Sequence, residues 1–245
     1  MTFWDISTER SVIGTRSFAR GARLLMLGMC LLMAASPGLS DVRGSDSRID
    51  RSLTAYYRHS QDTRIVTELG ANYAVRYAET GKDQDKGLAL KYLQEAVKLD
   101  SRAAAPKAWL GLVQCIDARE GCSKEKAKEG LVQMDKALKR DPKNLDLRLL
   151  RASVSVEAPR DFDRLDQSIA DLEFIRARVQ ADRSQAQIYE IEMPEVYLNL
   201  GLAYRGKGEL TKARTAWELA VKDGPATSYG QRAAKLLKKH PAPSR

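Results

Sequence analysis

The chain has 245 residues, of which 43% are hydrophobic and 30% charged, with a formal net charge of +9 at pH 7. This composition excludes an intrinsically disordered chain, and the length allows one or two ordinary domains or a short helical array. Good helix formers dominate from Asp62 onward, which favours an all-α fold. A functional basic face is one reading of the charge. Because the two signs alternate along most of the chain, we favour a mixed, solvated surface.

Residues 1–40 have the order of a secretory signal peptide. Four arginines precede the apolar or small residues from Leu24 to Ala35, and small residues then lead to a suitable cleavage point before Asp41. We therefore expect an exported chain, periplasmic or secreted, that is cleaved near Ser40. The apolar run is shorter than the roughly 20 residues that span a bilayer, and an uncleaved anchor is the alternative.

Residues 41–64 are expected to lead into the main domain, 65–240, and residues 241–245 form a tail. The polar stretch Asp41–Ser47 predicts a flexible start, and apolar spacing over Arg48–Tyr57 predicts a short helix.

The first predicted helix pair carries L-G-x-x-Y from Leu69 in one helix and A-x-x-x-L-x-x-A from Ala89 in the other. Between them, Thr80–Lys86 is charged and predicts a long linker.

In the second pair, Ala108-Trp109-x-x-Leu112 opens one helix, and a second helix closes before Asp141-Pro142. Cys115 and Cys122 lie between. On one continuous helix their Cα atoms would be about 10 Å apart, too far for a disulfide, so a bridge needs the helix to end near Gly121. In an exported chain we favour the disulfide, and two separate thiols are the alternative.

The third pair is indicated by Arg151-Ala152 and, after a loop over Ala158–Phe162, by Ser168-Ile169-x-Asp171-Leu172. The fourth pair has the strongest pattern, with nine marked positions: Tyr197, Leu200, Gly201, Tyr204, Gly208, Ala213, Trp217, Ala220 and Pro225.

These nine residues match the tetratricopeptide repeat at every signature position, and the chain resembles that family. The resemblance implies a right-handed superhelical solenoid of antiparallel helix pairs, with about four repeats. A helix over Gln231–His240 is expected to cap it.

The resemblance also implies a concave groove lined by the first helix of each pair. Mapped from the signature residues, its positions are Lys107, Leu110, Gln114, Asp117, Asp146, Leu149, Ser153, Glu195, Leu198, Leu202 and Arg205. A ladder of leucines in a groove suits an apolar peptide or helix. Alternatively, these leucines are covered by the chain's own N-terminal segment or by packing within the stack.

Catalysis is not indicated. The sequence contains no H-E-x-x-H, G-x-S-x-G or glycine-rich phosphate motif, and its two histidines, His59 and His240, lie outside the repeats. We expect a non-catalytic scaffold or adaptor of the bacterial cell envelope that binds a protein partner, with no metal, cofactor or nucleic acid. The alternative is a membrane- or polyanion-associated factor that uses Lys235, Lys238 and Lys239.

Overall fold

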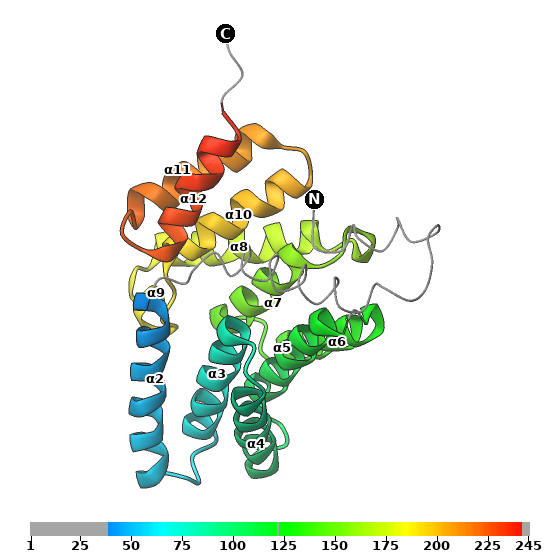
Figure 1. The fold of residues 1–245 in the computed structure, drawn as a ribbon, viewed down its shortest axis with the longest axis vertical. Coiled ribbons are helices and arrows are strands. Elements are labelled where there is room, and N and C mark those ends of the chain that lie inside the picture. Colours follow the sequence, from blue (N-terminus) through cyan, green and yellow to red (C-terminus); the bar gives the residue numbers. More distant parts are fainter. Residues whose placement is uncertain (1–38, 122, 242–245) are drawn as a thin grey trace, which may run out of the picture.

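The structure is a computed structural model that describes residues 39–121 and 123–241, and all regular structure in those ranges is helical (Figure 1). The predicted all-α fold is confirmed. In chain order the helices are α2 (Leu39–Arg58), α3 (Thr63–Thr80), α4 (Asp83–Leu99), α5 (Ala105–Glu120), α6 (Lys124–Arg140), α7 (Leu145–Glu157), the 3-10 turn η2 (Arg160–Phe162), α8 (Leu165–Ala181), α9 (Ser184–Ile188), α10 (Met193–Gly206), α11 (Leu210–Asp223) and α12 (Ser228–Lys239).

The helices pack as neighbouring pairs. These are α3 with α4, α5 with α6, α7 with α8, and α10 with α11. The first helices also contact one another in series, from α3 to α5, α5 to α7 and α7 to α10. At the two ends of the described chain, α2 packs on α3, and α12 packs on α10 and α11 (Figure 1).

Small residues let the two helices of a pair approach closely. A Cβ added at Gly70 would lie 2.7 Å from Leu93 Cγ, and one at Gly111 would lie 2.5 Å from the Gly130 carbonyl oxygen. In the fourth pair, a Cβ at Gly201 would overlap the indole of Trp217, which is fully buried. The contact between helices at Gly201 is therefore as the sequence pattern predicts.

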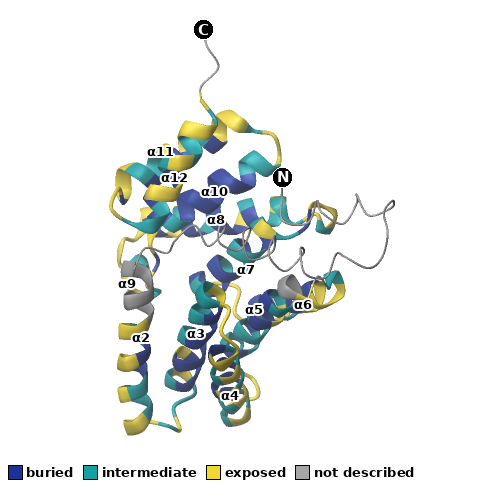
Figure 2. Cartoon of the chain, in the orientation of Figure 1, coloured by how far each residue is buried: buried dark blue, intermediate teal, exposed yellow. Residues whose placement is uncertain are grey.

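Among the described residues, buried side chains form three clusters in chain order rather than one central core. Figure 2 shows that buried residues occur on helices throughout the array. The first joins α2 to α5, the second joins α5 to α7, and the third joins α7 to α12. Helix α7 belongs to two of them, because Leu147 and Leu150 pack toward α5 and α6 whereas Leu149 and Ala152 pack toward α8 and α10. Helix α5 likewise supplies buried residues to the first and second clusters, so α5 and α7 connect the three clusters in series.

The linker between α3 and α4 is much shorter than its composition predicts. Only Gly81 and Lys82 separate the helices, and Gly81 takes the left-handed conformation (φ 66°) that caps α3. Asp83 and Asp85 instead form the first turn of α4, where carboxylates interact favourably with the helix dipole. The charged stretch is a helix start, not a long linker.

The start of the described chain also differs from expectation. Helix α2 runs from Leu39 to Arg58, so the segment 41–47 is helical rather than irregular, and the expected cleavage point before Asp41 falls in the first turn of this helix. The apolar run of the expected signal peptide lies outside the described residues. Within the described part, no helix has the length and apolar character needed to cross a membrane.

Of the two cysteines expected to form a disulfide, the described residues include Cys115 but not Cys122. Gly121 caps α5 as predicted, and Ser123 caps α6 by accepting a hydrogen bond from the Lys126 amide at 3.3 Å. Cys115 Sγ lies 3.4 Å from the Ala127 carbonyl oxygen. Because Cys122 lies outside the described residues, the disulfide stays a prediction.

Candidate functional site

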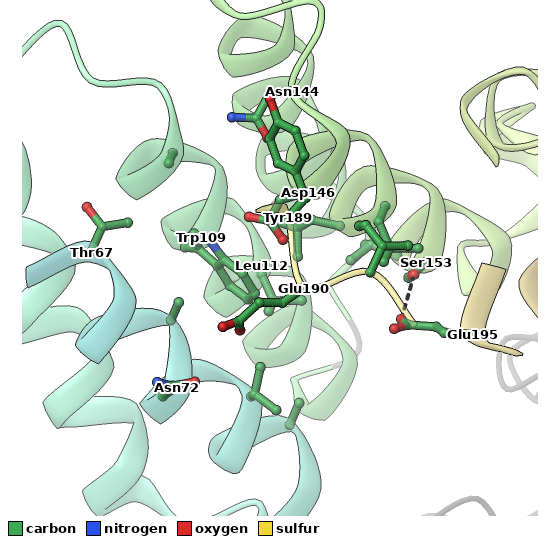
Figure 3. Close-up of a pocket in the computed structure, with 18 of the residues that line it drawn as sticks. Thr67, Asn72, Trp109, Leu112, Asn144, Asp146, Ser153, Tyr189, Glu190 and Glu195 are labelled. Atoms are coloured by element: carbon green, nitrogen blue, oxygen red, sulfur yellow. Dashed lines mark hydrogen bonds between the residues drawn. The ribbon is translucent and has the colours of Figure 1, made fainter. Parts of the chain in front are cut away.

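The first helices α3, α5, α7 and α10 line a cavity of about 1070 Å³ (Figure 3). The segment from Gln187 to Glu192, at the end of α9 and in the loop to α10, forms another wall. Arg48 of α2, Tyr229 and Arg232 of α12, two residues of α6 and residues of the loops that flank α7 also belong to the lining. All four helix pairs therefore contribute to one space.

Each first helix has a small residue in its contact with the second helix of the pair, and these are Gly70, Gly111, Ala152 and Gly201. When the four helices are aligned on these residues, the same positions of each helix line the cavity. The residues six positions earlier all line the cavity, and they are Arg64, Ala105, Asp146 and Glu195. The residues two positions earlier also line it, and they are Glu68, Trp109, Leu150 and Asn199. Each first helix thus turns the same face to the cavity.

Five of the eleven sequence-predicted groove residues line this cavity: Asp146, Leu149, Ser153, Glu195 and Leu198. All five lie on α7 or α10, where the pattern of small residues set the alignment. The other six are Lys107, Leu110, Gln114, Asp117, Leu202 and Arg205, and they lie elsewhere.

The predicted groove residues of α5, which are Lys107, Leu110, Gln114 and Asp117, fall outside the lining. The prediction places Trp109 at the first aromatic position of the repeat, and that position is wrong. The close contact lies at Gly111, two positions before the residue that this alignment requires. A shift of two residues turns a helix by about 200°, so the predicted positions fall on another face. With the corrected register, Ala105, Leu112 and Cys115 take their places in the lining.

The displaced residues of α5 have other contacts. Lys107 Nζ donates to the Ser101 carbonyl oxygen at 2.5 Å, and Leu110 packs on the cluster formed by α2 to α5. Gln114 is exposed. Asp117 pairs with Lys86 of α4, and its other oxygen lies 3.6 Å from Lys126 Nζ of α6.

The predicted leucine ladder is packed within the stack. Leu149, Leu198 and Leu202 are 8%, 1% and 6% exposed, and all three belong to the cluster from α7 to α12. Arg205 lies near Arg160 and Arg232, and desolvation followed by these two charges lowers its pKa. Of the two readings offered by the sequence, packing within the stack describes these leucines.

Glu195 is held by polar groups from neighbouring helices (Figure 3). Ser153 Oγ of α7 donates to Glu195 Oε1 at 3.4 Å, and Asn199 Nδ2 donates to Ser153 Oγ at 2.9 Å. Burial raises the pKa of the Glu195 carboxyl to about 7. The hydroxyls of Tyr229 and Ser153 oppose this rise, whereas the charges of Glu192 and Asp146 add to it.

Asp146 is the second unusual carboxyl of the cavity. Burial, and then the charge of Glu190, raise its pKa to about 6. Glu190 reaches the cavity from a backbone with φ 49°, in the left-handed region that side-chain-bearing residues rarely adopt. Among the described residues, no hydrogen bond or ion pair satisfies the Asp146 carboxylate.

The segment from Gln187 to Glu192 is a part of the site that the sequence analysis missed. It has no helical or strand periodicity, and its role in the wall follows only from the fold. The signal that was available is the acidic pair Glu190 and Glu192 on either side of Ile191, which is buried and fixes the segment.

The lysines expected to form a basic surface, Lys235, Lys238 and Lys239, are exposed on α12 and lie outside the cavity lining. The described residues contain no group of three or more His, Cys, Asp or Glu that could hold a metal ion. The cavity thus offers carboxylates, hydroxyls and apolar walls. Comparisons with protein-family models and with curated proteins found no match.

Proposed function

We propose that this chain is a tetratricopeptide-type adaptor that holds a segment of a partner protein in the cavity of its first helices. The observation that carries the proposal is the shared lining, in which α3, α5, α7 and α10 turn equivalent positions to one space. The nine signature residues of the fourth pair and the close contact at Gly201 support the family resemblance and the right-handed superhelical solenoid that it implies.

Export belongs to the same proposal. The arginines and apolar run of residues 1–40 support a signal peptide, and the partner is then a component of the cell envelope or of a secretion assembly. A cavity lined by the first helix of every pair supports this proposal, because repeat proteins bind their partners on concave surfaces. A binding role without catalysis agrees with the absence of catalytic motifs from the sequence.

Blocking the cavity without changing charge tests this proposal. Val75 lines the cavity, is half-buried, and belongs to none of the three clusters. We expect Val75→Trp to fill the space near α3 and to weaken capture of the partner at least tenfold, about 1.4 kcal/mol. The measurement is a pull-down of the native envelope fraction with the purified full chain, followed by mass spectrometry.

The matched control is Val132→Trp, the same substitution at an exposed position of α6 outside the cavity lining. It should capture the same partner as the unchanged chain. If Val75→Trp and the unchanged chain capture the same proteins in equal amounts, the cavity is not the binding site. The more obvious substitution of Leu198 by a charged residue is unsuitable, because Leu198 is buried and its loss would disturb the fold.

A further inference from the structure

The cavity is acidic although the chain is basic. Nine of its lining residues carry carboxyl groups, and three are arginines. One of these arginines, Arg232, is already paired with Glu157 at 3.3 Å. The chain as a whole has a formal net charge of +9, so the acidic excess is a local property of this space.

Asp146 and Glu195 are two of these carboxyl groups whose pKa is raised by burial, and no described cation pairs with either. Asp146 lies deep in the wall, where desolvation is the main influence on its pKa, while part of the side chain stays accessible from the cavity. No described residue donates a hydrogen bond to it or pairs with it. Glu195 contacts only uncharged donors, at Ser153 and Tyr229. Each side chain is half-buried in the first turn of its helix, where the helix dipole offsets part of the cost of burial, and a bound cation would offset more of it.

Glu190 brings a third acidic side chain to the same part of the cavity wall. Its left-handed backbone (φ 49°) ends α9, where the Glu190 amide donates to the Gln187 carbonyl oxygen at 3.3 Å. The conformation is fixed because the Ile191 amide donates to the Ala186 carbonyl oxygen at 2.8 Å. The result is that a third acidic side chain lies close enough to Asp146 to raise its pKa (Figure 3).

We infer that the occupant of the cavity is an extended cationic segment of the partner protein, whose Lys or Arg side chains are received by Asp146 and Glu195. This inference rests on the proposed function and adds the chemistry of the segment. Arg and Lys donate charge-assisted hydrogen bonds to carboxylates. Trp109 and Leu112 line the same space and provide an apolar wall for the aliphatic part of such a side chain.

The size of the cavity suits a peptide better than a single amine. Packed helices lie 8–10 Å apart, so four first helices in series extend over roughly 30 Å, the length of about nine extended residues. Acidic residues line the cavity on three of these helices, at Glu68 of α3, Asp146 of α7 and Glu195 of α10. Several cationic side chains of one segment can therefore bind together.

Binding is expected to depend on pH, because only the charged carboxylates attract a cation. The groups that face Asp146 and Glu195 are Glu190 and Glu192 of the segment before α10, Ser153 of α7, and Tyr229 of α12. Arg232 of α12 and Arg48 of α2 are the nearby cations of the lining. With pKa values of about 6 and about 7, both carboxyls lose their protons between about pH 5.5 and pH 8. Affinity for a cationic segment should rise at least about fivefold over this range.

The test uses the full chain and fluorescence anisotropy. The probe is a labelled peptide of about nine residues in which arginine alternates with alanine and leucine, and matched peptides carry glutamine or glutamate in place of each arginine. We expect the arginine peptide to bind at least tenfold more tightly than the glutamine peptide, and the glutamate peptide not to bind.

The decisive variant is Asp146→Asn with Glu195→Gln, which keeps the shape of both side chains. It should weaken binding of the arginine peptide at least tenfold and remove the pH dependence. Its matched control, Glu129→Gln with Glu218→Gln, makes the same change in net charge at exposed residues outside the cavity and should leave affinity within about twofold.

Equal binding of the arginine and glutamine peptides, or unchanged binding by the double variant, would overturn the inference. Tight binding of spermine without binding of the peptide would assign the cavity to a small polycation and also overturn it. Stronger binding of a peptide of residues 9–24 would assign the cavity to the chain's own arginine-rich leader.

The proposed function is tested separately, because Val75→Trp changes no charge. Loss of capture in that variant with no effect of the charge variant would leave the adaptor standing and reject the cationic segment.

Discussion

At the scale of single residues, the fourth helix pair depends on the contact between Gly201 and Trp217. The closest atoms to a Cβ at Gly201 all belong to the five-membered ring of the indole. Trp217 Nε1 is buried and has no hydrogen-bond partner among the described residues. The indole therefore contributes to this contact through its shape and not through a hydrogen bond of its nitrogen.

This contact predicts a strong coupling between two substitutions. Gly201→Ala should destabilise the chain by about 2 kcal/mol, because overpacking a buried contact typically costs 1–3 kcal/mol. In a Trp217→Phe background the five-membered ring is absent, and the same substitution should cost less by about 1 kcal/mol or more. Urea denaturation followed by circular dichroism measures both values.

Gly87 provides the control for helix propensity. It lies inside α4, is exposed, and has no neighbour within 4 Å of an added Cβ. Gly87→Ala should therefore stabilise the chain by about 0.5–1 kcal/mol. Equal effects of Gly201→Ala in the two backgrounds would mean that the indole does not set the spacing of α10 and α11.

At the scale of helices, a buried ion network joins α6, α7 and α8. Asp171 of α8 is 1% exposed and accepts hydrogen bonds from Arg148 at 2.6 Å and from Arg151 at 2.9 Å. Arg151 also pairs with Asp135 of α6 at 2.9 Å. Burial raises the pKa of Asp171 and both arginines lower it, so the arginines offset part of the cost of burying its charge.

Removing the charge of Asp171 should destabilise the third pair. Asp171→Asn leaves the largely buried Arg148 without a carboxylate and Arg151 with Asp135 alone, and we expect a loss of about 3 kcal/mol. The measurement is the denaturation midpoint of the full chain. Asp161→Asn, which removes an exposed partner of Lys124, should leave the midpoint unchanged. A similar midpoint for both variants would contradict a structural role for the network.

The predicted groove residues that do line the cavity lie on helices whose register was taken from small residues. Gly201 and Ala213 set the register of the fourth pair and Arg151-Ala152 that of α7, and five of the predicted residues on α7 and α10 line the cavity, whereas Leu202 and Arg205 do not. In α5 the large side chain of Trp109 misled the alignment, whereas Gly111 carried the correct register. Two helix backbones can approach closely only where the side chain between them is small. The small residue is therefore a more reliable marker of the repeat register than the aromatic residue.

The helix start at Asp83 and the acidic cavity could not be predicted from a local sequence pattern, because both depend on contacts between residues of different helices. The charged stretch after Thr80 was predicted as a linker because charge favours solvent, yet Asp85 is buried against Arg76 at 2.6 Å. The acidic character of the cavity arises from residues of α3, α7, α10 and the segment before α10, which are far apart in the sequence. Only the tertiary fold brings these side chains together.

At the scale of the whole molecule, the three clusters predict that the chain does not unfold as one unit. Each cluster joins neighbouring helices, and α7 alone supplies buried residues to both the second and the third cluster. In an array of this kind, the free energy of unfolding is close to the sum of the stabilities of the single helix pairs and of the contacts between neighbouring pairs. The cavity between the first helices limits direct contact between the two ends.

Hydrogen exchange of two matched leucine variants tests this prediction. Leu147 and Leu200 are each 1% exposed, but Leu147 packs in the second cluster and Leu200 in the third. Each Leu→Ala change should cost about 2–5 kcal/mol locally. We expect Leu147→Ala to increase amide exchange in α5 to α7 with a smaller effect in α10 to α12, and Leu200→Ala to give the reverse. Equal increases over all helices in both variants would instead mean a single cooperative core.

If the exchange is local, a segment bound along α3, α5, α7 and α10 would contact helices from all three clusters. Its binding should then slow amide exchange at both ends of the array together.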